Sequence, residues 1–139
     1  MAMTFQVTFD AADPHALCEF WAAALHYEIE PTDEEFIRSM VEQGHATEAE
    51  TAMVNGELRW RDATACSDPD GKGPRVYFQR VPEAKAGKNR VHLDLRSGGR
   101  ATEVKRLAAL GASQLYDGQQ GPLTWTTMAD PESNEFCVS

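Results

Sequence analysis

The stretch that decides the fold lies in the second half of the chain, where residues 90–95 read RVHLDL. Apolar and polar residues alternate along this stretch, which is the period of a half-buried β-strand. Gly98 and Gly99 interrupt the alternation. Residues 101–110 then place their apolar side chains on one face of an expected helix, and Gly111 follows as its C-terminal stop signal. The central part of this half therefore predicts a strand followed by a helix.

Three further strands are expected after that helix, at residues 114–116, 123–128 and 135–139. The strand at residues 123–128 is rich in β-branched and aromatic residues, which suit a pleated surface. Asp-Gly at residues 117–118 predicts a turn, and the DPESN sequence at residues 130–134 predicts another. The second half thus has the order β-α-β-β-β.

The first half follows the same order and carries an insertion. Residues 5–9 alternate like a strand, and Asp13-Pro14 then opens an apolar-striped helix that reaches Leu25. The next strands are expected at residues 26–30, 58–63 and 75–81. Residues 31–56 are less regular, with a capping box at residues 32–35 and an Asn-Gly turn signal at their end.

The spacing of the two halves indicates an internal repeat. Gln6 lies 19 positions before Leu25, and His92 lies 18 positions before Leu110. We therefore predict an α+β fold in one domain of residues 1–139. Its first β-α-β-β-β unit covers about residues 4–82 with the insertion at about 31–56, and its second unit covers about residues 89–139.

Composition excludes several classes of protein. The net charge of -9 disfavours nucleic acid as a partner, because phosphate binding needs a basic surface. No apolar run approaches the ~20 residues of a membrane span, and residues 1–4 carry no export signal, so no membrane partner is expected. Three cysteines without a CxxC pair fit neither a disulfide framework nor a zinc knuckle, and a reduced cytoplasmic setting is predicted.

Charge is distributed unevenly along the chain. Residues 1–70 hold 15 acidic and 3 basic residues, whereas residues 71–139 hold 7 acidic and 10 basic residues. Complementary halves meeting across a dimer, an acidic face that attracts a cationic ligand, and a merely solvated acidic surface are all consistent with this pattern.

Four motifs in this order resemble the vicinal oxygen chelate superfamily, and within it the bacterial glyoxalase-like domains. They are the Asp13-Pro14 helix that reaches residues 20–21, FQRVPE at 78–83, KNRVHLDL at 88–95, and the ending at 130–138. The superfamily includes glyoxalase I, extradiol dioxygenases, and fosfomycin and bleomycin resistance proteins. The resemblance covers nearly the whole chain and implies curved mixed sheets around a cleft, and a homodimer.

Ser133 departs from the family pattern, which usually has glycine there, and this predicts a different backbone angle in the turn. In metal-dependent members, four side chains from the first and last strands of each unit bind the ion. The positions that match are Gln6, Gln79, His92 and Cys137, of which only His92 is an ordinary ligand. A catalytic ion generally needs about three protein ligands. We therefore expect no metal and no other cofactor, with a divalent ion as the less favoured alternative.

Further residues share the expected face of these four positions, because alternate residues of a strand point the same way. The substrate-binding candidates are Gln6, Thr8, Tyr77, Gln79, Arg90, Asp94, Glu135 and Cys137. His92 is the catalytic candidate, since the ordinary pKa of an imidazole lies near neutrality.

Each of these roles has a plainer alternative. His92 is either a general acid–base or a half-buried histidine bonded to a neighbour such as Gln79. Asp94 either fixes the His92 tautomer or pairs with Arg90, which is itself a candidate clamp for a carboxylate. Cys137 is either a nucleophile or a small apolar residue.

The leading hypothesis is a glyoxalase-like domain that binds a small polar organic molecule in the cleft without metal, with proton transfer through His92 if it is an enzyme. Such an enzyme would be a lyase or isomerase of glyoxalase-like type. Two other classes stay open: a sequestering protein similar to bleomycin resistance proteins, and a metal-dependent lyase or isomerase.

Overall fold

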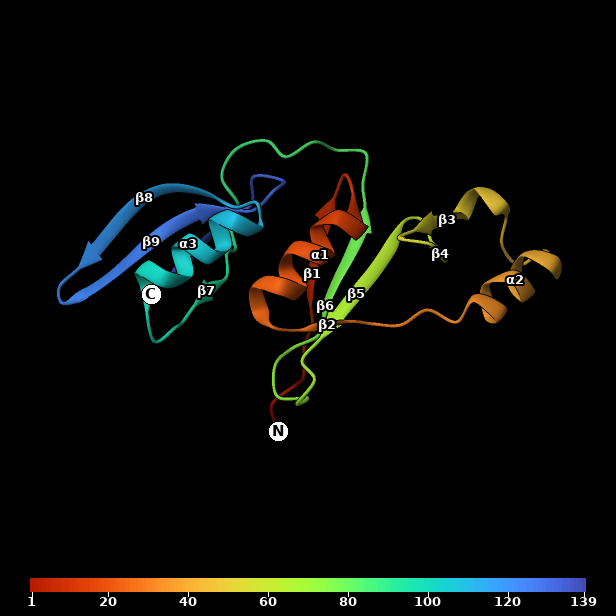
Figure 1. Cartoon of the computed structure of the whole chain (residues 1–139), viewed down its shortest axis with the longest axis horizontal. Coiled ribbons are helices and arrows are strands. Elements are labelled where there is room, and N and C mark those ends of the chain that lie inside the picture. The colour runs from red at the N-terminus through yellow and green to blue at the C-terminus, as the bar shows by residue number, and fades with distance from the viewer. The chain divides into compact units, whose positions relative to one another are not determined.

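The computed structural model describes all 139 residues, and the chain divides into two compact units, Met1–Pro82 and Glu83–Ser139. Helices and strands combine into the α+β architecture with curved mixed sheets that the sequence predicts (Figure 1). The fold prediction is confirmed. None of the helices combines the length and the apolar character that a membrane crossing requires.

The first unit is built on a four-stranded sheet in the order β1-β6-β5-β2. Its first and last strands, β1 and β6, are parallel neighbours, while β5 pairs with β6 and β2 in antiparallel fashion. One helix, α1, packs on this sheet (Figure 1). The bounds are β1 (Val7–Ala11), α1 (Pro14–Leu25), β2 (Glu28–Ile29), β5 (Ala63–Ser67) and β6 (Val76–Arg80).

The start and the buried face of α1 follow from its sequence. The Asp13 carboxylate caps the helix by accepting a hydrogen bond from the backbone N–H of Ala16 at 3.1 Å. The buried face places the Trp21 ring 5.2 Å from that of Phe9, which in turn stacks 5.5 Å from Phe78. This aromatic stack forms the core between helix and sheet.

The insertion of the first unit forms a separate small sheet. The insertion contains α2 (Glu34–Glu42), a short 3-10 helix η1 (Glu48–Glu50), and the hairpin strands β3 (Thr51–Val54) and β4 (Glu57–Trp60), which form the sheet. The single strand predicted at residues 58–63 is divided in the structure, because the chain turns after β4 and residue 63 begins β5 in the other sheet. Alternation alone does not reveal such a break.

The second unit repeats the strand order of the first. Its sheet has the order β7-β10-β9-β8, and its first and last strands, β7 and β10, are again parallel neighbours. The bounds are β7 (Asp94–Leu95), α3 (Arg100–Leu110), β8 (Ser113–Gln120), β9 (Leu123–Ala129) and β10 (Glu135–Val138). The internal repeat predicted from the spacing is therefore present as two sheets of identical connectivity.

Two strand predictions for this unit need correction. Of the strand expected at residues 90–95, only residues 94–95 form a strand, as β7, and residues 90–93 precede it without regular structure. The turn expected at residues 117–118 is absent, because β8 runs through them and Gly118 pairs with Trp125 of β9. The chain reverses instead near Gly121, whose φ of 56° is left-handed.

The turn between β9 and β10 is held by Asp130. Its Oδ1 accepts backbone hydrogen bonds from Glu132 and Asn134, both at 2.9 Å. Ser133 has a φ of 71°, so the serine adopts the left-handed conformation rather than a different angle. The expectation drawn from the Ser133 departure is wrong: the side-chain bonds of Asp130 impose the turn on a residue that pays a steric cost there.

Candidate functional site

The sheet of the second unit has one apolar and one polar face. Phe136 and Val138 of β10 are buried together with Met128 of β9 and Leu107 of α3. Cys137 points the other way, as do its register partners Asp94 of β7 and Thr127 of β9.

A cavity of about 580 Å³ lies on this polar face, which is within the range of small-molecule sites. Residues from all four strands and from the segment before β7 form its wall. They are Lys88, His92, Asp94, Arg96, Tyr116, Gln120, Leu123, Thr124, Trp125, Thr127, Glu135, Cys137 and Ser139.

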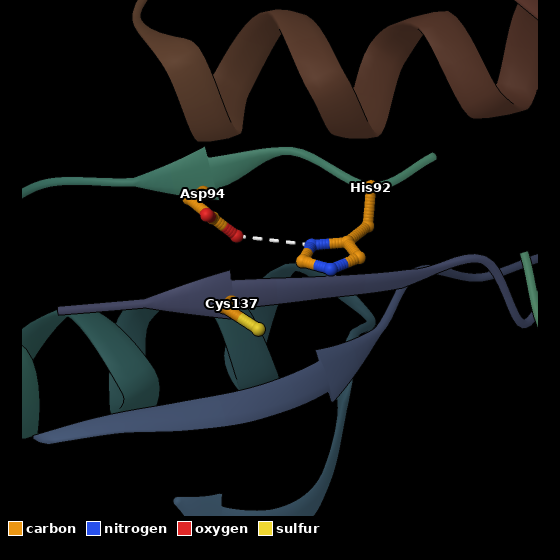
Figure 2. Close-up of side chains that lie close together, drawn as sticks. All are labelled: His92, Asp94 and Cys137. Carbon is orange, nitrogen blue, oxygen red and sulfur yellow. Dashed lines mark ion pairs between the residues drawn. The ribbon is translucent and has the colours of Figure 1, made fainter. Parts of the chain in front are cut away.

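His92 and Asp94 form a pair inside this cavity. The imidazole Nδ1 lies 2.9 Å from Asp94 Oδ1, and Figure 2 shows the two side chains extending from the same segment toward each other. An ionised carboxylate only accepts hydrogen bonds, so Nδ1 carries a proton, and in the neutral ring Nε2 is the unprotonated nitrogen. The His92 side chain keeps 37% of its surface exposed and is accessible to a ligand.

Cys137 completes a cluster with this pair. It extends from β10 next to His92 and Asp94 (Figure 2), and its Sγ lies 3.5 Å from Thr127 Oγ1. One imidazole nitrogen, one carboxylate oxygen and the thiol sulfur lie within 4.8 Å of one another. These donor types are ones that Zn²⁺ and related ions accept, so the chemistry of the set fits a metal. Two such ligands on one tetrahedral ion lie about 3.3 Å apart, whereas Nδ1 and Oδ1 here are at hydrogen-bonding distance.

Glu135 lines the cavity, but its carboxylate is already engaged. It accepts a hydrogen bond from the backbone N–H of Asn89 at 3.0 Å and forms an ion pair with Lys85 Nζ, also at 3.0 Å. The Asn89 N–H, and then the Lys85 ammonium, lower the pKa of Glu135 to about 2. Its role is therefore to fix the segment before β7 against β10.

Arg90, also predicted as a substrate-binding residue, does not line this cavity and forms no pair with Asp94. It lies before β7, where the backbone is not extended, and its side chain is exposed. Asp94 lies 2.9 Å from His92 Nδ1 and has no ion pair with Arg90.

The other four predicted residues belong to the first unit. Thr8 and Tyr77 are register partners on β1 and β6, and Gln79 shares their face of the sheet. Gln79 Nε2 donates to Asp10 Oδ1 at 2.8 Å within the first unit. Gln6, just before β1, accepts a hydrogen bond from Arg75 through its side-chain oxygen at 3.1 Å.

Arg75 organises this face of the first unit. Its guanidinium forms two 2.8 Å hydrogen bonds to the Glu30 carboxylate and lies 5.4 Å from the centre of the Tyr77 ring. This guanidinium, together with a hydrogen bond from Ser67, lowers the pKa of Glu30. Tyr77 and Arg75 also line a smaller cavity of about 300 Å³, next to Trp60 of the insertion.

Several residues that line the cavity of the second unit were not predicted from the sequence as site residues. Arg96 lies two residues after Asp94 and four after His92, so the same period-2 argument points to it. The sequence did not show on which face of the sheet Trp125 and Tyr116 lie. Their orientation depends on the pairing of β8 with β9, which cannot be read from the sequence of one strand.

A duplicated β-α-β-β-β unit with a polar cavity on one sheet face defines the vicinal oxygen chelate class of proteins. The model of the glyoxalase-like domain family matches residues 6–139, and the chain belongs to this family. No curated protein matches the sequence significantly.

Solved structures of low sequence identity share the fold. A glyoxalase/bleomycin resistance protein/dioxygenase family enzyme from Burkholderia phytofirmans has a TM-score of 0.64 at 13% identity, over 96% of this chain and 94% of that one. The bleomycin-binding protein of Streptomyces verticillus, complexed with copper(II)-bleomycin, has a TM-score of 0.57 at 14% identity, over 100% and 96%. A fosfomycin resistance protein from Listeria monocytogenes, complexed with Mn(II) and a dihydroxypropylphosphonic acid, has a TM-score of 0.64 at 9% identity, over 99% and 89%.

Proposed function

We propose that the protein binds a small polar organic molecule in the cavity of the second unit, and that His92 exchanges a proton with it. The observation that carries this proposal is the His92–Asp94 pair, with Nδ1 bonded at 2.9 Å inside a cavity of about 580 Å³. The carboxylate holds the ring in the tautomer whose Nε2 accepts a proton. It also stabilises the imidazolium that forms.

The proton step then gives a lyase or an isomerase. Nε2 takes a proton from a C–H or O–H group of the bound molecule, and the electron pair of that bond stays on the molecule. If the imidazolium returns the proton to a different atom, the molecule is isomerised. If the electron pair instead expels a leaving group, and the imidazolium protonates that group, a bond is cleaved without water or a redox partner.

The test starts with the tautomer. In ¹⁵N-resolved NMR spectra, we expect the neutral His92 ring to carry its proton on Nδ1, and Asp94→Asn to weaken that preference. Ligands are then screened by NMR against the unmodified protein, against His92→Ala, and against His45→Ala. His45→Ala is the matched control, because His45 is an exposed histidine of the first unit. Turnover that His92→Ala abolishes and His45→Ala preserves supports the proposal. Unchanged ligand, bound equally well by His92→Ala, would identify a sequestering protein instead.

A metal-dependent lyase or isomerase is the second candidate, and the donor cluster of His92, Asp94 and Cys137 favours it. These three residues would hold the ion, which would polarise an oxygen of the ligand as a Lewis acid. Metal content of untagged protein, measured by mass spectrometry before and after incubation with Ni, Zn, Fe and Mn, separates the two candidates. Our proposal expects no stoichiometric retention. Retention of one ion, lost in Cys137→Ala, would replace it with the metal-dependent reading.

A further inference from the structure

We propose that the ligand of this cavity is a planar organic anion, stacked on Trp125 with its carboxylate bound by Arg96. This inference rests on the proposed function only in that it concerns the same cavity. Neither Arg96 nor the indole takes part in the proton step described for His92.

The position of the Trp125 ring depends on a glycine on the neighbouring strand. Gly118 of β8 pairs with Trp125 of β9, and the indole lies directly against the Gly118 backbone. A Cβ at residue 118 would lie 2.3 Å from Trp125 Cε2 and 2.5 Å from Cζ2 and Nε1, so the indole would have to shift to admit a side chain there. The backbone at residue 118 is not left-handed, so the glycine is needed for space and not for its φ.

The ring held in this way forms a flat wall of the cavity. Trp125 is half-buried and lines the cavity together with Tyr116, which is 55% exposed. Leu123 at the end of the same strand is 66% exposed and adds apolar surface. An uncovered aromatic wall of this kind fits a ligand with a planar ring, because offset stacking adds to the burial of apolar area.

The charges of the cavity are not balanced by their neighbours. Of the two acidic side chains in its wall, Glu135 is paired with Lys85 outside the wall. Asp94 accepts a hydrogen bond from His92 and keeps its negative charge while the ring is neutral. Lys88 and Arg96 form no ion pair and no hydrogen bond. These two cations outnumber the one carboxylate that no cation neutralises, and Arg96 offers the planar donor geometry that binds a carboxylate through two hydrogen bonds.

Three probes of matched shape separate the two parts of this inference. They are 2-naphthoate, the neutral 2-naphthamide, and the saturated decahydro-2-naphthoate. We expect 2-naphthoate to bind at least 5-fold more tightly than either of the others in calorimetric titrations. The indole N–H signals of the three tryptophans in NMR spectra report the place of binding, and only that of Trp125 should shift strongly.

Variants test each residue with a control that leaves the rest of the wall unchanged. Gly118→Ala displaces the indole and should weaken 2-naphthoate binding at least 5-fold, whereas Gly98→Ala should not, because nothing lies within 4 Å of a Cβ at Gly98. Arg96→Gln should remove the preference for the carboxylate over the amide and keep the preference for the aromatic over the saturated ring. Trp125→Leu should remove the preference for the aromatic over the saturated ring and keep the preference for the carboxylate over the amide.

The outcomes distinguish this inference from the proposed function. Equal affinity for all three probes, or binding that Gly118→Ala and Arg96→Gln leave unchanged, would overturn the inference. In that case, a different molecule that is turned over through His92 would leave the proposed function standing. Conversely, selective 2-naphthoate binding at Trp125, with no ligand ever converted by the protein, would support the inference and contradict the proton-transfer step.

Discussion

The two units have the same strand order, but they leave the polar faces of their sheets in opposite states. In the first unit, Arg75 is bonded to the Glu30 carboxylate and to Gln6, so its charge is compensated within the unit. In the second unit, Arg96 faces a cavity of about 580 Å³ without any partner. The same strand order thus holds an arginine that is paired within its unit in one case and an arginine at an open site in the other. The side chains, and not the backbone, determine the difference.

Net charge divides in the same way. Residues 1–82 hold 15 acidic and 6 basic residues, whereas residues 83–139 hold 7 of each, so the whole net charge of -9 belongs to the first unit. The second unit, neutral in total, keeps two of its cations in the cavity wall. An anionic ligand therefore meets a local positive site in a chain that is acidic overall.

The largest expected effect concerns the aromatic core, which is a feature of the first unit. Phe78→Ala removes a fully buried ring that stacks on Phe9, and we expect the free energy of unfolding to fall by about 3–5 kcal/mol. Denaturant unfolding followed by tryptophan fluorescence measures the change. Phe36→Ala is the control, since Phe36 is 52% exposed and its loss should cost less than about 0.5 kcal/mol.

The two arginines give the most direct test of the comparison. Arg75→Met breaks a two-bond ion pair that is partly exposed, and should lower the free energy of unfolding by about 1 kcal/mol. Arg96→Met should change it by less than about 0.5 kcal/mol, because Arg96 has no partner to lose. Equal losses in the two variants would show that the faces of the two sheets do not differ as described.

Acid stability should distinguish Glu135. Its pKa of about 2 lies below the ordinary value of 4.5, so its ionised form stabilises the folded state fully above about pH 4.5. That contribution is lost as the pH falls from there to about 2. Glu135→Gln should therefore flatten the decline of stability across this window, whereas Glu83→Gln, at an exposed residue, should leave the decline as it is. Thermal unfolding at a series of pH values provides the measurement.

The smallest expected effect concerns the turn after β9. Ser133→Gly relieves the left-handed backbone at a φ of 71° and should raise the free energy of unfolding by about 0.5–1 kcal/mol. Ser133→Ala keeps a Cβ and should give no such gain. If both variants were equally stable, the Asp130 hydrogen bonds alone would account for the turn.

Local signals in the sequence predicted the parts of the fold that depend on few residues. The Asp13 cap and the apolar stripe gave α1, and the spacing of Gln6 and His92 from their helices gave the repeat. Gly118 was taken for a turn residue because Asp-Gly favours turns, whereas it actually makes room for a tryptophan on the next strand. That requirement comes from the register of β8 and β9, which lies outside any local window.

The same limit explains the site. His92 and Asp94 are two residues apart, so their shared face was predictable, and their pairing required no long-range information. The neighbours of Gln79 and Glu135 were not predictable, because Asp10, Lys85 and Asn89 reach them through strand pairing and through the course of a connecting segment. Residues 31–56 were predicted to be irregular, and the strand at residues 51–54, which pairs with residues 57–60 in a separate small sheet, was not predicted.

The pairing of the first strand with the last one also sets the order in which each unit is assembled. Asp10 pairs with Gln79, which lies 69 residues later, and Asp94 pairs with Cys137, which lies 43 residues later. Closing the longer loop costs about 0.4 kcal/mol more chain entropy, but in both units this long-range pairing should be a late step. The β8–β9 hairpin, by contrast, joins neighbours in the sequence. During folding of the second unit, we therefore expect the Trp125 wall to form before the segment that carries His92 and Asp94 joins β10, so that the surface for stacking is in place before the histidine that moves the proton.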